Sequence, residues 1–182
     1  WGTSVDVPRL TVGGLIPHDR VVISFNLFVI GSVDGQLAPN PEWFTVKADG
    51  REVFRHTFSN ITTDLYGNQG IQSYSGNDAV GEYPPFTGAL EARTLGYVGN
   101  DSVYRISLTV PHTAASLETS WHMALDETID NESWGLDAVE IRVVPTGLVG
   151  SAFGSNEFGQ IGDGTKDYRS TPTTIRGIAG LI

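Results

Sequence analysis

The sequence predicts an all-β protein: a two-sheet antiparallel, jelly-roll-like sandwich followed by a short C-terminal glycine-rich repeat segment. Twenty-two glycines and nine prolines break the chain of 182 residues at short intervals. Val, Ile, Thr and aromatic residues fill the segments between these breaks, a mixture that is typical of many short strands joined by turns. Several of these segments alternate apolar and polar residues, and none has the period of a long helix.

The clearest strand is predicted at residues 20–30, because alternate side chains there form one uniformly apolar face: Val21, Ile23, Phe25, Leu27 and Val29. The opposite face is mixed, which suits a strand in the middle of a sandwich sheet. Asp49-Gly50 is the best short hairpin signal. Further strands are predicted at residues 10–15, 43–48, 52–58, 102–110, 117–125 and 138–144.

Residues 59–94 are dominated by Gly, Asn, Ser, Tyr and Pro, and predict a long loop region with at most one short strand. Long loops on a rigid sandwich often carry function. Tyr66, Tyr74 and Tyr83 are therefore candidate ligand-binding residues, since aromatic faces offer apolar area with a polar handle. The alternative is a packed meander whose aromatic rings are pinned onto a sheet.

Composition excludes several classes of function. The net charge of −10 opposes binding to phosphate backbones, so no nucleic-acid partner is expected. The longest apolar stretch, residues 21–30, is too short and too polar to span a membrane. The chain has no cysteine, which excludes disulfides and thiolate chemistry. No catalytic residue is predicted, because no histidine pairing or nucleophile elbow is present; carboxylates such as Glu82 and Glu91 leave a glycosidase as a third hypothesis.

Carboxylates crowd together at residues 126–132, where like charges repel unless a cation or hydrogen-bond donors neutralise them. With acidic residues from elsewhere in the chain they form a plausible oxygen cage for a hard cation such as Ca²⁺. The candidate metal ligands are Asp34, Asp130, Glu132 and Asp137. The alternative is an acidic loop in water.

A family resemblance covers most of residues 10–144. It is carried in order by residues 21–35, 57–60, 94–97, 101–107 and 130–137, the last being Asp-Asn-Glu-Ser-Trp-Gly-Leu-Asp. These blocks resemble a lectin-like β-sandwich domain of secreted bacterial proteins. The resemblance implies an extracellular binding or adhesion module with a structural calcium site and no catalysis. Val33, Asn131 and Ala138 stand where that family usually has Trp, an acidic residue and Asn, so a calcium site weaker than the family norm, or none, is expected.

A second resemblance covers residues 152–178. The spacing Gly-x-Asn-x-x-Gly-Gln-x-Gly-x-Gly-Thr within residues 153–165 is similar to the repeat of the regulator-of-chromosome-condensation propellers. The resemblance implies that this motif has an architectural role and carries no catalytic or binding chemistry. Its closely spaced glycines permit positive φ in tight turns. A single blade cannot bury its faces. The composition changes at Pro145-Thr-Gly147, after which small residues and glycines follow with no long apolar run. We therefore place a boundary at Thr146, with the sandwich at 1–146 and a partial repeat or docking tail at 147–182.

The sequence thus predicts a non-catalytic, extracellular or cell-surface module that binds a glycan or another surface ligand. The alternative is a structural subunit of an extracellular filament or array that self-associates through residues 148–182, because unpaired strand edges make such pairing easy.

Overall fold

The structure, a computed structural model, describes residues 7–37, 40–63, 67–77, 81–97, 100–146 and 151–175. The chain divides into two compact units, Trp1–Val144 and Pro145–Ile182. Every regular element among the described residues is a strand, as the sequence predicts. Over the same residues there is no helix long and apolar enough to cross a membrane.

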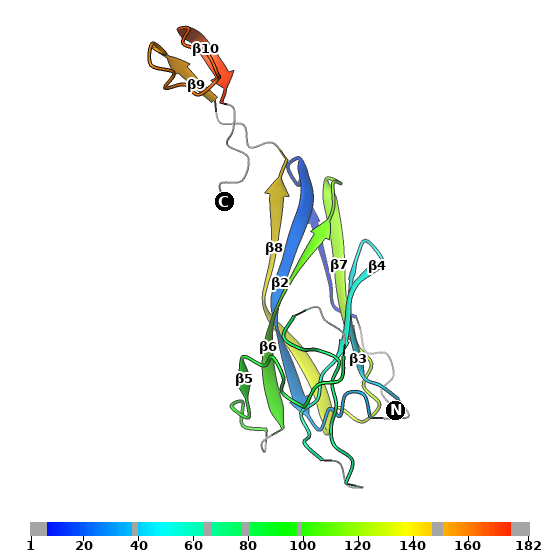
Figure 1. The fold of residues 1–182 in the computed structure, drawn as a ribbon. Coiled ribbons are helices and arrows are strands. Elements are labelled where there is room, and N and C mark those ends of the chain that lie inside the picture. Colours follow the sequence, from blue (N-terminus) through cyan, green and yellow to red (C-terminus); the bar gives the residue numbers. More distant parts are fainter. Residues whose placement is uncertain are drawn as a thin grey trace. The chain divides into compact units, whose positions relative to one another are not determined.

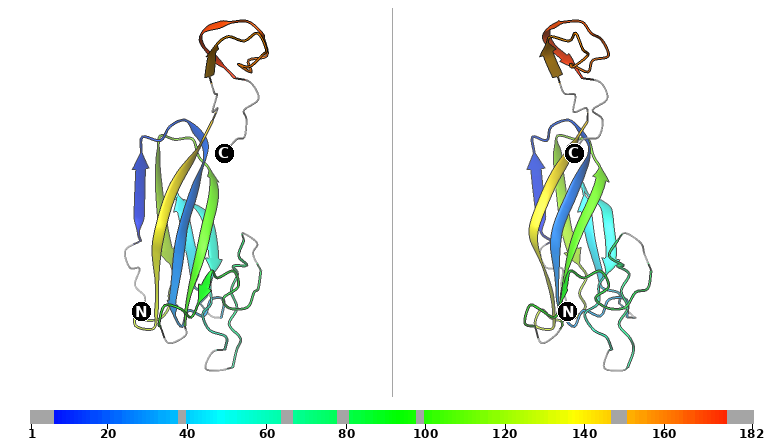
Figure 2. Two further views of the ribbon diagram at one scale, coloured as in Figure 1. Left: turned by 90° about the vertical axis from the view of Figure 1, so that its left-hand side faces the viewer. Right: turned by 60° about the vertical axis from the view of Figure 1, so that its left-hand side comes forward.

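The first unit contains two four-stranded sheets that form a β-sandwich (Figures 1 and 2). We name each sheet after one of its two inner strands. The β3 sheet has the order β1 (Arg9–Gly13), β7 (Ser116–Met123), β3 (Trp43–Ala48), β4 (Arg51–Thr57). The β2 sheet has the order β5 (Glu91–Ala92), β6 (Asp101–Pro111), β2 (His18–Gly31), β8 (Glu132–Pro145).

The core lies between these sheets. The apolar face predicted for β2 is confirmed, since all five of its side chains are at most 1% exposed. Phe25 on this face lies against the β3 sheet, with its ring centroid 6.0 Å from that of Phe44 and 5.9 Å from that of Trp121. Burial of such large side chains is the main stabilising contribution to a sandwich of this kind.

The hairpin predicted at Asp49-Gly50 joins β3 to β4. Both residues have positive φ, 49° and 76° respectively, as a two-residue turn of this type requires. The side chain of Asp49 also accepts a hydrogen bond from the backbone N–H of Glu118 at 2.9 Å, which fixes the turn against β7.

Strand β8 contains a bulge. Trp134 and Leu136 pack on the core before it, and Ile141 and Val143 pack on the core after it. The residues that face the core thus have even numbers in the first pair and odd numbers in the second. Alternate side chains of a strand point to opposite faces, so this change requires one extra residue in the strand. Ala138 lies between the two pairs with a φ of 50°, in the left-handed region that alanine rarely adopts.

The long segment between β4 and β5 is largely a packed meander, which is the alternative that the sequence left open. Gln72 is fully buried and donates hydrogen bonds to the carbonyls of Tyr74 and Thr87 at 2.7 and 2.9 Å. Asn60, 1% exposed, donates to the carbonyl of Val29 at 2.9 Å and accepts from Ser102. These side chains take the place of a strand ladder in satisfying the buried backbone groups.

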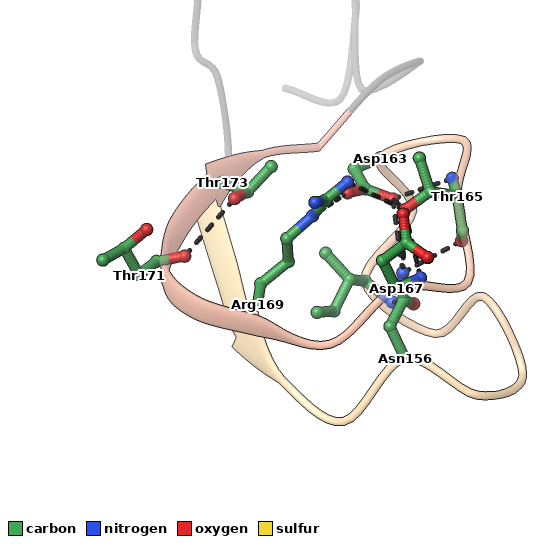
Figure 3. Close-up of polar contacts among 8 residues, drawn as sticks. Asn156, Asp163, Thr165, Asp167, Arg169, Thr171 and Thr173 are labelled. Carbon is green, nitrogen blue, oxygen red and sulfur yellow. Dashed lines mark hydrogen bonds and ion pairs between the residues drawn. The ribbon is translucent and has the colours of Figure 1, made fainter.

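The second unit contains a two-stranded antiparallel sheet of β9 (Ser151–Gly154) and β10 (Arg169–Thr174). The glycine-rich connection is folded around the side chain of Asp163 (Figure 3). This carboxylate accepts from the Thr165 N–H at 2.9 Å and from Arg169 Nε at 2.6 Å. These contacts, the Thr165 backbone bond above all, lower the pKa of Asp163 to about 2. Asn156 completes the arrangement by donating to the carbonyl of Thr165 at 2.9 Å.

Candidate metal centre

Three chain segments meet at one end of the first unit: the loop after β2, the residues just before β3, and the β7–β8 loop with the start of β8. Backbone hydrogen bonds hold them together. Ser32 N–H donates to the carbonyl of Asn131 at 3.0 Å, and the Glu42 N–H donates to the carbonyl of Gly35 at 2.9 Å. The sandwich strands thus bring to one place residues that are far apart in the sequence.

Glu42 is the centre of this arrangement. Its side chain is fully buried, and Oε2 accepts hydrogen bonds from the backbone N–H groups of Asp34 at 2.7 Å and Gly35 at 3.1 Å. Gly35 has a φ of 78°, and a Cβ at this position would lie 2.4 Å from the carbonyl oxygen of Ile71. Only glycine therefore allows the loop to turn its N–H groups toward the carboxylate.

The β7–β8 loop is fastened to the end of β2 by equally close packing. A Cβ on Gly31, whose φ is 87°, would lie 1.8 Å from the carbonyl oxygen of Asn131. The side chain of Asn131 accepts from Ser32 Oγ at 2.9 Å and donates to Glu127. The next residue, Glu132, is thereby held with its side chain pointing inward, at 3% exposure.

Glu42, Asp126 and Glu132 form a group of carboxylates in which one oxygen from each lies within 4.8 Å of the others. Asp126 is exposed, and the two glutamates are buried. Glu42 Oε1 and Glu132 Oε2 are both inaccessible to solvent and have no hydrogen-bond partner among the described residues. A buried charged oxygen without a donor is costly, so this group requires either a proton or a cation.

The electrostatics of the neighbouring side chains agree with this requirement. Burial raises the pKa of Glu132 well above its ordinary value, and the adjacent Glu42 carboxylate raises it further. Burial and the charges of Glu42 and Asp126 raise the pKa of Asp34 to about 7. The dominant charged neighbours in both cases are acidic, so the site attracts positive charge.

The donor set is made of carboxylate oxygens, which suit a hard metal ion. Oxygens within 4.8 Å of one another fit around a single ion, since opposite ligands of a large divalent cation are about 5 Å apart. The residues present therefore fit a bound metal ion.

The four metal ligands predicted from the sequence do not all lie in this group. Glu132 belongs to it. Asp34 is its neighbour, close enough for its pKa to depend on Glu42 and Asp126. Asp130 and Asp137 are exposed and are not among its three members. Val33, which stands where the resembling family has Trp, is fully buried and helps to fill the core.

Glu42 was not predicted from the sequence. It stands alone between Pro41 and Trp43 rather than in an acidic run, and its role depends on the path of the loop that precedes it. Asp126 belongs to the crowded acidic segment that the sequence does single out, but no pattern distinguishes it from its neighbours. The one sequence feature that could have pointed to Glu42 is its position as a lone acidic residue immediately before a predicted strand.

The candidate ligand-binding tyrosines occupy different environments. Tyr74 is 4% exposed and packs among core rings, with its centroid 4.9 Å from that of Phe58 and 5.6 Å from that of Tyr104. Tyr83 is half-buried, and its backbone pairs with that of Gln72. Tyr66 lies outside the described residues. Of the three, only Tyr83 has a described side chain that reaches the surface.

Comparisons with known proteins add no assignment: no protein-family model, curated protein or solved structure matches the chain.

Proposed function

We propose that the first unit is a non-catalytic, extracellular binding or adhesion module whose loop end is held together by a calcium ion. The observation that carries the proposal is the pair of buried oxygens, Glu42 Oε1 and Glu132 Oε2, which have no partner among the described residues. An ion there would link the loop after β2 to the start of β8. The jelly-roll-like connection of the strands and the propeller-type character of the second unit are part of the same proposal.

Calcium is the cation that the site favours. Its ligands are oxygens, its shell tolerates irregular geometry, and carboxylates at 2.3–2.6 Å are its usual partners. Magnesium demands a near-ideal octahedron and keeps several waters, which a site with two buried glutamates does not favour. Zinc would take histidine or cysteine, and neither residue type is a member of the group.

A binding role fits the placement of the carboxylates better than catalysis does. Glycoside hydrolysis needs two carboxyls that face a sugar across an open site. Glu42 and Glu132 are instead buried beneath the loops that they connect. An ion held there stabilises the loops rather than reacting with a substrate.

Binding of the full chain to a panel of neutral and acidic glycans, in calcium and after calcium depletion, tests this proposal. We expect binding to at least one glycan class, without cleavage of the glycan, and weaker binding after calcium depletion because the loops at the cation site loosen. Turnover of a bound glycan would contradict the non-catalytic role. Absence of binding to every glycan would contradict the glycan-binding role.

One observation favours a structural subunit as a second candidate. The second unit exposes large aromatic side chains: Phe153 at 69%, Phe158 at 86% and Tyr168 at 70%. Exposed apolar groups of this size are typical of contact surfaces. If this unit assembles copies of the chain, Phe158→Ser will abolish concentration-dependent association in sedimentation experiments. A wild-type chain that stays monomeric at high concentration would rule this candidate out.

A further inference from the structure

The outer face of the β3 sheet, which faces away from the core, is hollowed. The hollow has a volume of about 360 Å³ and is lined by Val7 and by polar and charged side chains of four adjacent strands. We call it the outer groove and define it by Arg9, Thr45, Lys47, Glu52, Ser120 and His122. The carboxylates of the candidate metal centre do not line it, so it is a separate site.

The strand register explains the hollow. Ser120 on β7 lies between Arg9 on β1 and Lys47 on β3, its partners in the two ladders. In the next row, Thr45 lies between His122 on β7 and Arg55 on β4. Each line of cross-strand partners therefore has a short hydroxyl side chain in the middle and a long side chain on either side. This leaves space above the hydroxyl groups.

The groove is basic on a chain whose net charge is −10. Arg9 forms an ion pair with Glu118 at 2.6 Å. For Lys47 and Arg55, both exposed, no ion pair is found within the described part of the chain. Glu52 is the acidic residue of the lining and lies opposite Lys47 in the β3–β4 ladder. Two cations that form no ion pair, beside hydroxyls, favour an anionic ligand that also carries hydroxyl groups.

Arg55 is held in place for such a ligand. Its guanidinium carbon lies 4.4 Å from the ring centroid of Trp43, a half-buried residue on the neighbouring strand. A guanidinium held over an aromatic ring is restricted in its motion, and its N–H donors can bind a carboxylate with two hydrogen bonds. Lys47 adds a point charge nearby, and Ser120 and Thr45 add hydroxyl groups that pair with sugar hydroxyls.

We propose that the outer groove binds an acidic polysaccharide, a chain of sugars whose carboxylates contact Lys47 in the groove and Arg55 beside it, opposite Thr45 on β4. A glycan fits better than an acidic peptide, because the groove alternates charged groups with hydroxyls, and Glu52 can accept hydrogen bonds from sugar hydroxyls, which acidic peptide side chains lack. The inference rests on the proposed binding role but not on the cation.

The test compares short oligogalacturonate with its methyl ester in calorimetric titrations of the full chain. The two ligands have the same sugar chain, and the ester replaces each carboxylate with a neutral methyl ester, so the comparison needs no variant. We expect the acid to bind roughly tenfold more tightly than the ester, and raised salt to reduce this difference. Equal affinity for acid and ester would overturn the inference, yet it would leave the glycan-binding role intact. Binding of neither ligand, nor of any other glycan, would contradict both.

Two charge reversals locate the site. Lys47→Glu and Arg55→Glu are each expected to weaken oligogalacturonate binding by roughly tenfold or more. Arg105→Glu is the matched control, because Arg105 is an exposed cation on β6 of the other sheet, and it should bind like the wild type. Wild-type binding by both groove variants would overturn the placement in the groove. Tighter binding of oligoglutamate than of oligogalacturonate would overturn the inference in favour of an acidic protein partner.

Discussion

Glu42 and Glu132 meet at one end of the sandwich with one oxygen each buried and without a hydrogen-bond partner among the described residues. Glu42 comes from the approach to β3, and Glu132 is the first residue of β8. Backbone N–H groups satisfy only the other oxygen of Glu42. The fold therefore builds an acidic centre whose buried oxygens need either a proton or a cation.

Glu132→Gln is expected to abolish the response to calcium while leaving the calcium-depleted protein almost unchanged. In calcium-depleted buffer at about pH 7 the variant should melt close to the wild type, because burial and Glu42 raise the pKa of Glu132 to about 10 and this carboxyl is then already neutral. Calcium should then raise the wild-type melting temperature but not that of the variant. Glu118→Gln removes an exposed carboxylate distant from the cluster and serves as the control. A variant that still responds fully to calcium would contradict the site.

Without calcium, the stability of the first unit should fall as pH rises through about 7. The pKa of Asp34 is raised from 3.8 to about 7 by burial and by Glu42 and Asp126, with Glu127 also facing it. The folded state thus binds this proton more tightly than the unfolded state. The resulting stabilisation is complete below the ordinary pKa and is lost as pH rises through the folded value.

Melting curves of the calcium-depleted wild type and of Asp34→Asn, from about pH 5 to about pH 8, check this pH dependence. The asparagine variant should lack the part of the slope that Asp34 contributes. Identical slopes for the two proteins would show that Asp34 is not responsible.

Ala138→Gly should stabilise the first unit by about 0.5–1 kcal/mol, because glycine adopts positive φ without the steric cost that alanine carries. Ala138 has a φ of 50° at the bulge of β8 and is exposed, so no packing is lost. Glu140→Gly, at an exposed position of the same strand that is not among those with positive φ, should instead destabilise. Denaturant unfolding of the three proteins measures the difference. If both glycines have the same effect, the bulge is not strained.

Asn60→Ala should destabilise the first unit by about 2–4 kcal/mol, because it leaves buried carbonyl groups without donors. The amide of Asn60 connects the end of β2 to β6 through Val29 and Ser102. Asn26→Ala, on the outer face of β2, is the control and should change stability by less than about 1 kcal/mol. A small effect of Asn60→Ala in urea unfolding would show that water replaces its contacts.

Much of the sandwich follows from local pattern. The strand containing Phe25 alternates cleanly, and Asp49-Gly50 can form only a tight turn, so both were predictable from the residues themselves. The bulge at Ala138 was not, because an alanine gives no sign of positive φ, and the apolar residues around it still alternate locally. The meander beyond β4 is held by side chains such as Gln72, whose partners are set by the tertiary fold.

The candidate metal centre was predictable only in part, for a related reason. Glu132 lies within a run of acidic residues, and crowded carboxylates indicate a cation. Glu42 lies in no such run, and it reaches the site because the loop containing Asp34 and Gly35 folds back onto it. Long-range contacts between loops leave no periodic signal in the sequence. Only the structure could therefore identify Glu42 as the residue that lies beside Glu132.

Calorimetric titration of calcium into the metal-depleted full chain is the sharpest test of the cation site. We expect one calcium ion per chain and no binding to Glu42→Gln or Glu132→Gln. We also expect stabilisation of the wild type by about 2.7 kcal/mol when free calcium is about 100 times its dissociation constant. Absence of calcium binding to the wild type, or unchanged binding to both variants, would contradict the claim that these two glutamates hold a cation.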